Sequence, residues 1–130
     1  DLLSTATRER AGHYRIDPAA RKRKPDPLVG RAVAYMEAHI GEKISLAGLA
    51  RHLNAGASTV SHRFHAFTGE SPMQTLKRMR MVRARIMLLQ GHRVADIAAA
   101  LGFYDEHHFS LAFKRAEGVS PRAFRNGSGT

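Results

Sequence analysis

Apolar residues recur every three or four positions along most of this 130-residue chain, the spacing that buries one face of an amphipathic helix. A first helix is predicted after Asp26-Pro27, where an N-cap residue precedes a proline suited to the first helical turn. Its apolar face, which ends before Gly41, contains Val29, Val33, Met36 and Ile40. We expect this face to pack against the segments that follow.

Two helices joined by a tight turn are predicted next. Ser45 caps the first of them, and its apolar stripe contains Leu46, Leu49, Ala50 and Leu53. Asn54 then tolerates the positive φ of a turn. The second helix starts near Ala57 and ends around Thr68-Gly69, with an inward face of Val60, Phe64 and Phe67.

The longest predicted helix runs from Ser71-Pro72 to about Gln90, with basic side chains interleaved among the apolar positions Leu76, Met79, Val82, Ile86 and Leu89. Another helix pair follows, with a turn at Gly102 and Asp105 as the N-cap of its second helix. The stripe of this pair contains Val94, Ile97, Ala98, Leu101, Phe109, Ala112, Phe113 and Ala116. A last helical turn is expected at Pro121–Arg125, with Phe124 inward. The long helix should act as a strut between the two pairs.

The two helix pairs are copies of one unit. A shift of 49 residues superimposes five identical residues over positions 61–72, namely Ser110 on Ser61, Phe113 on Phe64, Gly118 on Gly69, Ser120 on Ser71 and Pro121 on Pro72. A pair with Gly or Asn in its turn is typical of a helix-turn-helix, whose second helix enters a DNA major groove. An ordinary helical hairpin has the same apolar spacing. The duplication, in a basic chain, favours DNA binding.

Charge points to the same class of partner. Lys and Arg number 21 against 11 Asp and Glu, a net charge of +10 that favours a polyanion such as nucleic acid. A membrane surface is the competing polyanion, but the basic residues lie on several short predicted helices, with no single long amphipathic face. No apolar run approaches the roughly 18–20 residues that cross a bilayer. We therefore expect a cytoplasmic protein without a membrane partner.

Enzyme chemistry has little support in the sequence. There is no Cys, which excludes thiolate metal sites, disulfides and a cysteine nucleophile. No His-Glu-x-x-His pattern and no glycine-rich phosphate loop occurs, so neither an enzyme nor a cofactor is predicted. The His pairs 62/65 and 107/108 lack a carboxylate or Cys at ligand spacing, and no metal site is expected.

Three groups of residues carry a resemblance to a known family. They are Ser71-Pro72-Met73-Gln74-Thr75-Leu76 with Arg80-Met81 and Ala84; Ile97-Ala98 with Leu101-Gly102-Phe103; and Phe109-Ser110-Leu111-Ala112-Phe113-Lys114-Arg115 with Gly118-Val119-Ser120-Pro121 and Phe124-Arg125. Through them, residues 28–125 resemble the C-terminal DNA-binding domain of the AraC/XylS family of bacterial transcription regulators. The second-repeat pattern is long and specific, and the first repeat is the looser match.

The resemblance implies an all-α fold of seven helices, in which a long central helix (about 72–90) joins two helix-turn-helix subdomains (about 45–68 and 94–117) within a DNA-binding domain of residues 27–125. It also implies that the recognition helices enter adjacent major-groove segments on one DNA face, about 34 Å apart. Residues 1–26, with the basic run 21–24, are interpreted as a flexible linker or tail. Residues 126–130 are interpreted as a flexible end.

Site residues are carried over from the family position by position. Base contacts fall on Ser58, Ser61 and His62 in the first motif, and on Glu106, His107, Ser110 and Leu111 in the second. Phosphate contacts are assigned to Thr59, His65, Arg80, His108, Lys114 and Arg115.

The chain departs from the usual family pattern at four positions. His62 and Leu111 stand where the family commonly has Arg, Gly56 replaces a common Ser, and Arg63 occupies a commonly apolar position. Leu111 is a candidate for contact with a thymine methyl group, and Glu106 for accepting a hydrogen bond from cytosine N4.

The predicted partner is double-stranded DNA, and the family suggests RNA polymerase as a partner of the full regulator. It also suggests an N-terminal effector-binding or dimerisation domain ahead of residue 1, commonly in an activator. The alternative is a helical protein-interaction module without specific DNA binding. Salt dependence separates the two, because phosphate contacts release counterions from DNA.

Overall fold

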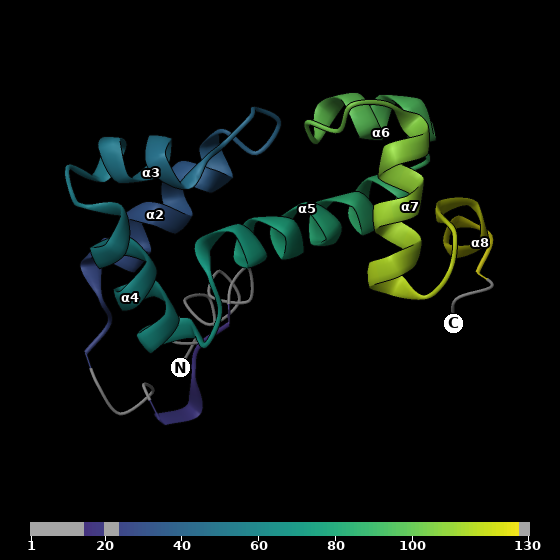
Figure 1. The fold of residues 1–130 in the computed structure, drawn as a ribbon. Coiled ribbons are helices and arrows are strands. Elements are labelled where there is room, and N and C mark those ends of the chain that lie inside the picture. Colours follow the sequence, from purple (N-terminus) through teal and green to yellow (C-terminus); the bar gives the residue numbers. More distant parts are fainter. Residues whose placement is uncertain (1–14, 20–23, 128–130) are drawn as a thin grey trace. The chain divides into compact units, whose positions relative to one another are not determined.

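The computed structural model describes residues 15–19 and 24–127, and this part of the chain contains seven α-helices and no β-strand (Figure 1). The helices are α2 (Pro27–Ala38), α3 (Leu46–Leu53), α4 (Ala57–Thr68), α5 (Pro72–Leu89), α6 (Val94–Ala100), α7 (Glu106–Glu117) and α8 (Pro121–Arg125). The predicted all-α fold is confirmed, with helix bounds close to those expected. Most of the predicted linker, with residues 21–23 of its basic run, and the end at 128–130 lie outside the described residues.

The helix ends form where the sequence predicts them. The Asp26 carboxylate accepts a hydrogen bond from the Leu28 amide at 2.9 Å, and the Ser45 hydroxyl accepts one from the Gly48 amide at 3.0 Å. Asn54 ends α3 in the left-handed region with φ 54°, a conformation that Asn adopts more readily than most residues. The starts of α2 and α3 and the end of α3 are thus delimited by their own sequence.

Two compact units divide the chain. The first contains α2, α3, α4 and α5 up to Met79, and the second contains the loop Ile40–Lys43, α5 from Arg80 onward, and α6 to α8. Each unit therefore holds one of the two repeated helix pairs. None of the helices formed by the described residues is long and apolar enough to cross a membrane.

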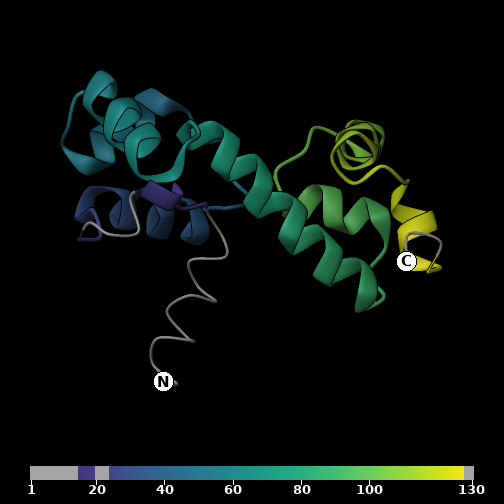
Figure 2. The ribbon, with the colours of Figure 1, turned by 90° about the horizontal axis from the view of Figure 1, so that it is seen from below.

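The first unit is built on three helices that pack on one another. Helix α2 contacts both α3 and α4, which also contact each other, as both ribbon views show (Figures 1 and 2). The predicted apolar faces meet in this core, where the fully buried side chains include Val29, Met36, Leu49, Val60 and Phe64. Arg63, at a commonly apolar position of the family, faces outward and pairs with the α2 cap Asp26, with Nη2 and Oδ1 2.6 Å apart.

The second unit has a core of aromatic rings in contact with one another. The Phe109 ring lies 5.2 Å from that of Phe103 and 5.8 Å from that of Phe113, which in turn lies 5.6 Å from Phe124. These tilted and edge-to-face contacts join α7 to α8 and to the α6–α7 turn, and such pairs each contribute about 0.5–1.5 kcal/mol beyond area burial. Ile97 and Leu101 are fully buried beside them.

Part of the predicted apolar stripe is exposed. In the second half of α5, Met81, Ala84 and Leu88 are buried, whereas Ile86 is 47% and Leu89 69% exposed. The buried residues are spaced three and four apart and form one line, and Ile86 and Leu89 fall outside it. Ala116 is also exposed, because it lies about 60° around α7 from Phe113, which marks the buried line.

The loop Ile40–Lys43 is held to the second unit by close backbone contact. Arg80 donates from Nε to the Ile40 carbonyl at 3.0 Å and from Nη2 to the Glu42 carbonyl at 2.8 Å. A Cβ added to Gly41 would lie 2.3 Å from the Ala100 carbonyl oxygen, and one added to Gly102, at φ +79°, would lie 2.9 Å from that of Gly41. Both positions therefore require glycine.

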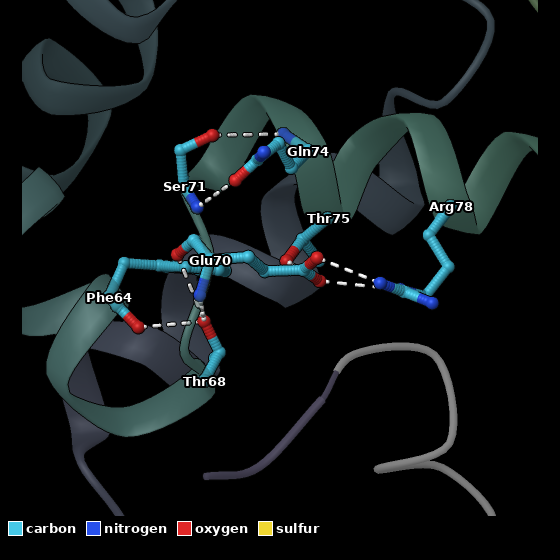
Figure 3. A network of polar contacts seen from close by, with 7 residues as sticks. All are labelled: Phe64, Thr68, Glu70, Ser71, Gln74, Thr75 and Arg78. Atoms are coloured by element: carbon cyan, nitrogen blue, oxygen red, sulfur yellow. Dashed lines mark hydrogen bonds and ion pairs between the residues drawn. The ribbon is translucent and has the colours of Figure 1, made fainter.

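A polar network joins α4 to α5 in the first unit (Figure 3). The Glu70 side chain accepts hydrogen bonds from the Thr75 hydroxyl at 2.8 Å and from Arg78 Nη2 at 2.8 Å, and Glu70 is only 6% exposed. The buried Thr68 hydroxyl shares its proton between the Phe64 carbonyl of α4, at 2.7 Å, and the Glu70 carbonyl beyond the helix, at 3.0 Å, and accepts from the Glu70 amide at 3.1 Å. The two buried residues of this junction, Thr68 and Glu70, thus have hydrogen-bond partners for their side-chain oxygens.

Ser71 and Gln74 fix the start of α5. The Ser71 amide donates to Gln74 Oε1 at 2.8 Å, and the Gln74 amide donates to Ser71 Oγ at 3.2 Å (Figure 3). This reciprocal capping box satisfies two backbone donors at the helix end.

Replacing Gly41 by Ala should destabilise the protein by about 1–3 kcal/mol, because the new methyl group meets a backbone oxygen that cannot turn away. The matched control is Gly30→Ala in α2, where nothing lies within 4 Å of the added Cβ. That change should raise stability by up to about 1 kcal/mol, the helix preference of Ala over Gly. Urea unfolding followed by circular dichroism measures both, and equal effects of the two substitutions would contradict this account of the loop.

Acidification should weaken the α4–α5 junction through Glu70. Burial alone raises the pKa of Glu70, but the hydrogen bonds from Arg78 and Thr75 and the charge of Arg78 together outweigh this effect. The pKa therefore lies below its ordinary value of 4.5. The ionised carboxylate therefore stabilises the fold fully above pH 4.5, and this stabilisation is lost as the pH falls through the lowered pKa.

Glu70→Gln should cost roughly 1–2 kcal/mol at neutral pH, a modest value because Arg78 stays partly hydrated. Its stability should also decline less than that of the original protein when the pH drops. Thermal melts between neutral and acidic pH measure this difference. The exposed Glu106→Gln serves as a control with the same change in charge, and an identical acid response of the two variants would exclude the role given to Glu70.

Candidate nucleic-acid interface

Helix α4 turns a polar face to solvent. Val60 and Phe64 are each 1% exposed and fix the inner face. The predicted contacts lie on the remaining surface, where the exposed residues are Ser58, Thr59, His62 and His65, and Ser61 is half-buried. Positions 58, 61, 62 and 65 follow helical spacing and share one face. Small hydroxyls and imidazoles are thereby gathered on one side of the helix, where each has hydrogen-bonding groups to offer.

Helix α7 repeats this arrangement in the second unit. Phe109 and Phe113 are fully buried and fix its inner face. The predicted contacts that are exposed are Glu106, His107, His108, Leu111, Lys114 and Arg115, and Ser110 is half-buried. Leu111 is 50% exposed, one of only a few large apolar side chains among the described residues that remain in water. The outer face thus combines an acidic start, a central apolar residue and a basic end.

The start of α7 is held more firmly than that of α4. Asp105 accepts a hydrogen bond from the His108 amide at 2.7 Å, and the His108 ring meets the edge of Phe103 with centroids 5.9 Å apart. Gly56, the N-cap of α4, forms no side-chain hydrogen bond. The Ser that the family commonly has there would supply the missing acceptor.

Arg80 has a different environment from the other predicted phosphate contacts. Its guanidinium donates to the Ile40 and Glu42 carbonyl oxygens, and burial lowers its pKa from the ordinary value, although an arginine remains charged. Two of its N–H groups are thus used to hold a loop. No sequence pattern indicates this role, because the partners are backbone atoms about forty residues away.

One basic residue near α7 was missed by the sequence analysis. Arg122 of α8 is exposed and lines a hollow of about 320 Å³ together with Glu106, His107 and Ser110. It lies outside both helix-turn-helix repeats, so no motif singles it out. Its positive charge is the one feature of the sequence that could have suggested contact with DNA.

The described residues include no metal-binding cluster. Within residues 15–19 and 24–127, no three His, Asp or Glu side chains are grouped so that they could hold a metal ion.

Comparison with known sequences places the repeats in a defined family. A family model described as a helix-turn-helix domain matches residues 49–127. The HTH-type transcriptional activator RhaS of Salmonella schwarzengrund is 32% identical over 103 residues, which are 78% of this chain and 37% of that protein. RhaS of Salmonella arizonae matches to the same extent. The chain thus spans little more than a third of the length of these relatives.

Solved structures resemble the same region. The C-terminal domain of AraT, a response regulator from Geobacillus stearothermophilus, superimposes with a TM-score of 0.75 and 33% identity, covering 78% of this chain and 86% of that one. An AraC-type regulator from Chromobacterium violaceum gives 0.71 and 29%, covering 77% and 90%. The DNA-binding domain of AdpA, determined in complex with a target DNA, gives 0.72 and 30%, covering 79% and 93%.

Substitutions at the two caps should have opposite effects on stability. Asp105→Ala should cost about 1 kcal/mol, because the His108 amide loses its acceptor. Gly56→Ser should add a few tenths of a kcal/mol, because a Cβ there meets only the Thr59 hydroxyl, at 4.0 Å, and the Ser hydroxyl can cap α4. Thermal unfolding measures both, and a loss of stability in Gly56→Ser would show that the cap geometry is different.

Proposed function

Because this chain belongs to the AraC/XylS family of transcription regulators, as a DNA-binding domain of that family, we propose that it binds specific double-stranded DNA sequences through the outer faces of α4 and α7. The observation that carries the proposal is the repeated geometry: each unit buries the apolar side of one such helix and leaves its polar side in water. The DNA-binding domain of AdpA, a relative with 30% identity, was determined in complex with a target DNA, which supports DNA as the partner. The family comprises regulators and not enzymes, which agrees with the prediction from sequence.

Helix α4 would read bases through Ser58, Ser61 and His62. Hydroxyl groups donate and accept, and an imidazole does one or both according to its protonation, so these groups suit the mixed donors and acceptors of base edges. None of the three provides the bidentate fork with which Arg recognises guanine. We therefore expect weaker discrimination by α4 than in relatives with Arg at the position of His62.

Helix α7 would read bases through Glu106, His107, Ser110 and Leu111. A carboxylate accepts from cytosine N4, and an exposed leucine covers a thymine methyl group. The 50% exposure of Leu111 in the free protein fits this assignment, since burial against DNA would remove apolar surface from water. The two helices would occupy adjacent major-groove segments, so that one chain reads a bipartite site.

Phosphate contacts would fall on Thr59 and His65 of α4 and on His108, Lys114 and Arg115 of α7. These side chains are all exposed. Arg80 is left out of this set, because two of its N–H groups already hold the loop Ile40–Lys43. Lys114 and Arg115 give α7 its positive end and contribute most of the charge attraction expected from this helix.

In the full regulator, we propose an additional N-terminal effector-binding or dimerisation domain, contact with RNA polymerase, and a role as an activator in the cytoplasm. The relatives named as transcriptional activators support this role, and this chain covers 37% of their length.

Substitutions on the outer faces should separate base readout from phosphate binding. Ser61→Ala and His62→Ala should change the base preference in a selection from a random duplex pool, with modest effect on unspecific binding. Lys114→Ala should weaken all duplexes alike and reduce the slope of log K against log salt by about 0.9. Selection followed by sequencing, and fluorescence anisotropy over a salt series, measure the two effects.

The same measurements distinguish the alternative function. A helical protein-interaction module would select no duplex sequence, and its DNA binding would lack the predicted salt slope. Unchanged base preference in both Ser61→Ala and His62→Ala would remove α4 from the proposed site.

A further inference from the structure

We propose that Arg122 of α8 binds a phosphate of the DNA on the α7 side and offsets the negative charge of Glu106. The inference rests on the proposed function, because it assigns a further DNA contact to the same domain. It adds a helix outside both helix-turn-helix repeats to the binding surface.

The two residues line the same hollow beside α7. The hollow lies within the second unit, has a volume of about 320 Å³, and is lined by the first residues of α6, α7 and α8 and by the next turn of α7. Three of the proposed base contacts, Glu106, His107 and Ser110, belong to this lining, and so does Arg122. A DNA strand at the outer face of α7 would therefore pass the opening of the hollow.

The charged groups in the hollow are available to a ligand. Arg122 and Glu106 are both exposed, and within the described residues neither side chain takes part in a hydrogen bond or an ion pair. A free guanidinium offers two parallel N–H groups to a phosphate, the geometry in which Arg binds this group most strongly. The DNA backbone is the source of phosphate that the position beside α7 favours.

Arg122 would also offset the repulsion between the Glu106 carboxylate and the DNA phosphates. A carboxylate that approaches cytosine also approaches the phosphates, and like charges repel. Lys114 is eight residues further along α7, about 12 Å at 1.5 Å per residue, which exceeds the Debye length of about 10 Å at 0.1 M salt. Cations at that distance are screened from Glu106. Arg122 lines the same hollow and supplies the compensating charge there.

The test is a double-mutant cycle of Arg122→Gln and Glu106→Gln on the duplex that the original protein selects. Arg122→Gln should weaken binding several-fold and reduce the salt slope by about 0.9, the value for one phosphate. Adding Glu106→Gln to that variant should restore part of the affinity, because the uncompensated carboxylate is gone. The two substitutions are therefore expected to be non-additive. Arg122→Lys should keep the slope.

The matched control is Lys43→Gln, which removes the same charge from an exposed position of the second unit that does not line the hollow. It should show no coupling to Glu106→Gln. Circular dichroism confirms that each variant is folded. An Arg122→Gln variant with unchanged affinity and slope, or strictly additive effects in the cycle, would overturn the inference. Failure of the original protein to select a duplex would instead overturn the proposed function.

Discussion

Burial of one side of each reading helix is the constraint on which the structure depends. In α4 this side is fixed by Val60 and Phe64, and in α7 by Phe109 and Phe113. The two residues of each pair are four positions apart. Each side chain removes enough apolar surface from water to contribute about 1.5–3 kcal/mol. A helix anchored in this way cannot rotate about its axis, so its opposite face is presented in one orientation. The hydroxyls, imidazoles and charges there are ordered by hydrophobic packing, with little help from polar contacts of their own.

Much of this architecture was predictable because it is encoded locally. Helix ends followed from Asp26, Ser45 and Asp105, whose side chains cap the next turn, and from Asn54 at positive φ. The apolar stripes of the short helices fixed their inner faces, and hence the exposure of the predicted contacts. The repeat then identified which two helices are equivalent. The bases read by these residues stay predictions.

Contacts that join distant segments were beyond the sequence. The side of α5 that is buried changes with the partner it packs against, so Ile86 and Leu89 could not be distinguished from Leu88 by spacing alone. Arg80 was predicted to contact a phosphate, and its hydrogen bonds to the Ile40 and Glu42 carbonyls could not be foreseen, because backbone partners leave no pattern in side-chain chemistry. The buried position of Glu70 could not be predicted either, because its partners Thr75 and Arg78 reach its carboxylate only when the α4–α5 junction has folded (Figure 3).

The loop Ile40–Lys43 has an implication for how such domains can be divided. It belongs to the second unit, although the segments on both sides of it in the chain belong to the first. A fragment that begins at Arg80 would lack these four residues, and Gly102 and the Arg80 guanidinium would lose the backbone that covers them. The duplicated halves are therefore not independent modules in sequence. A chimaera made by joining two genes within α5 would take its first half, and with it this loop, from one regulator. The loop would then have to fit the second half of another regulator.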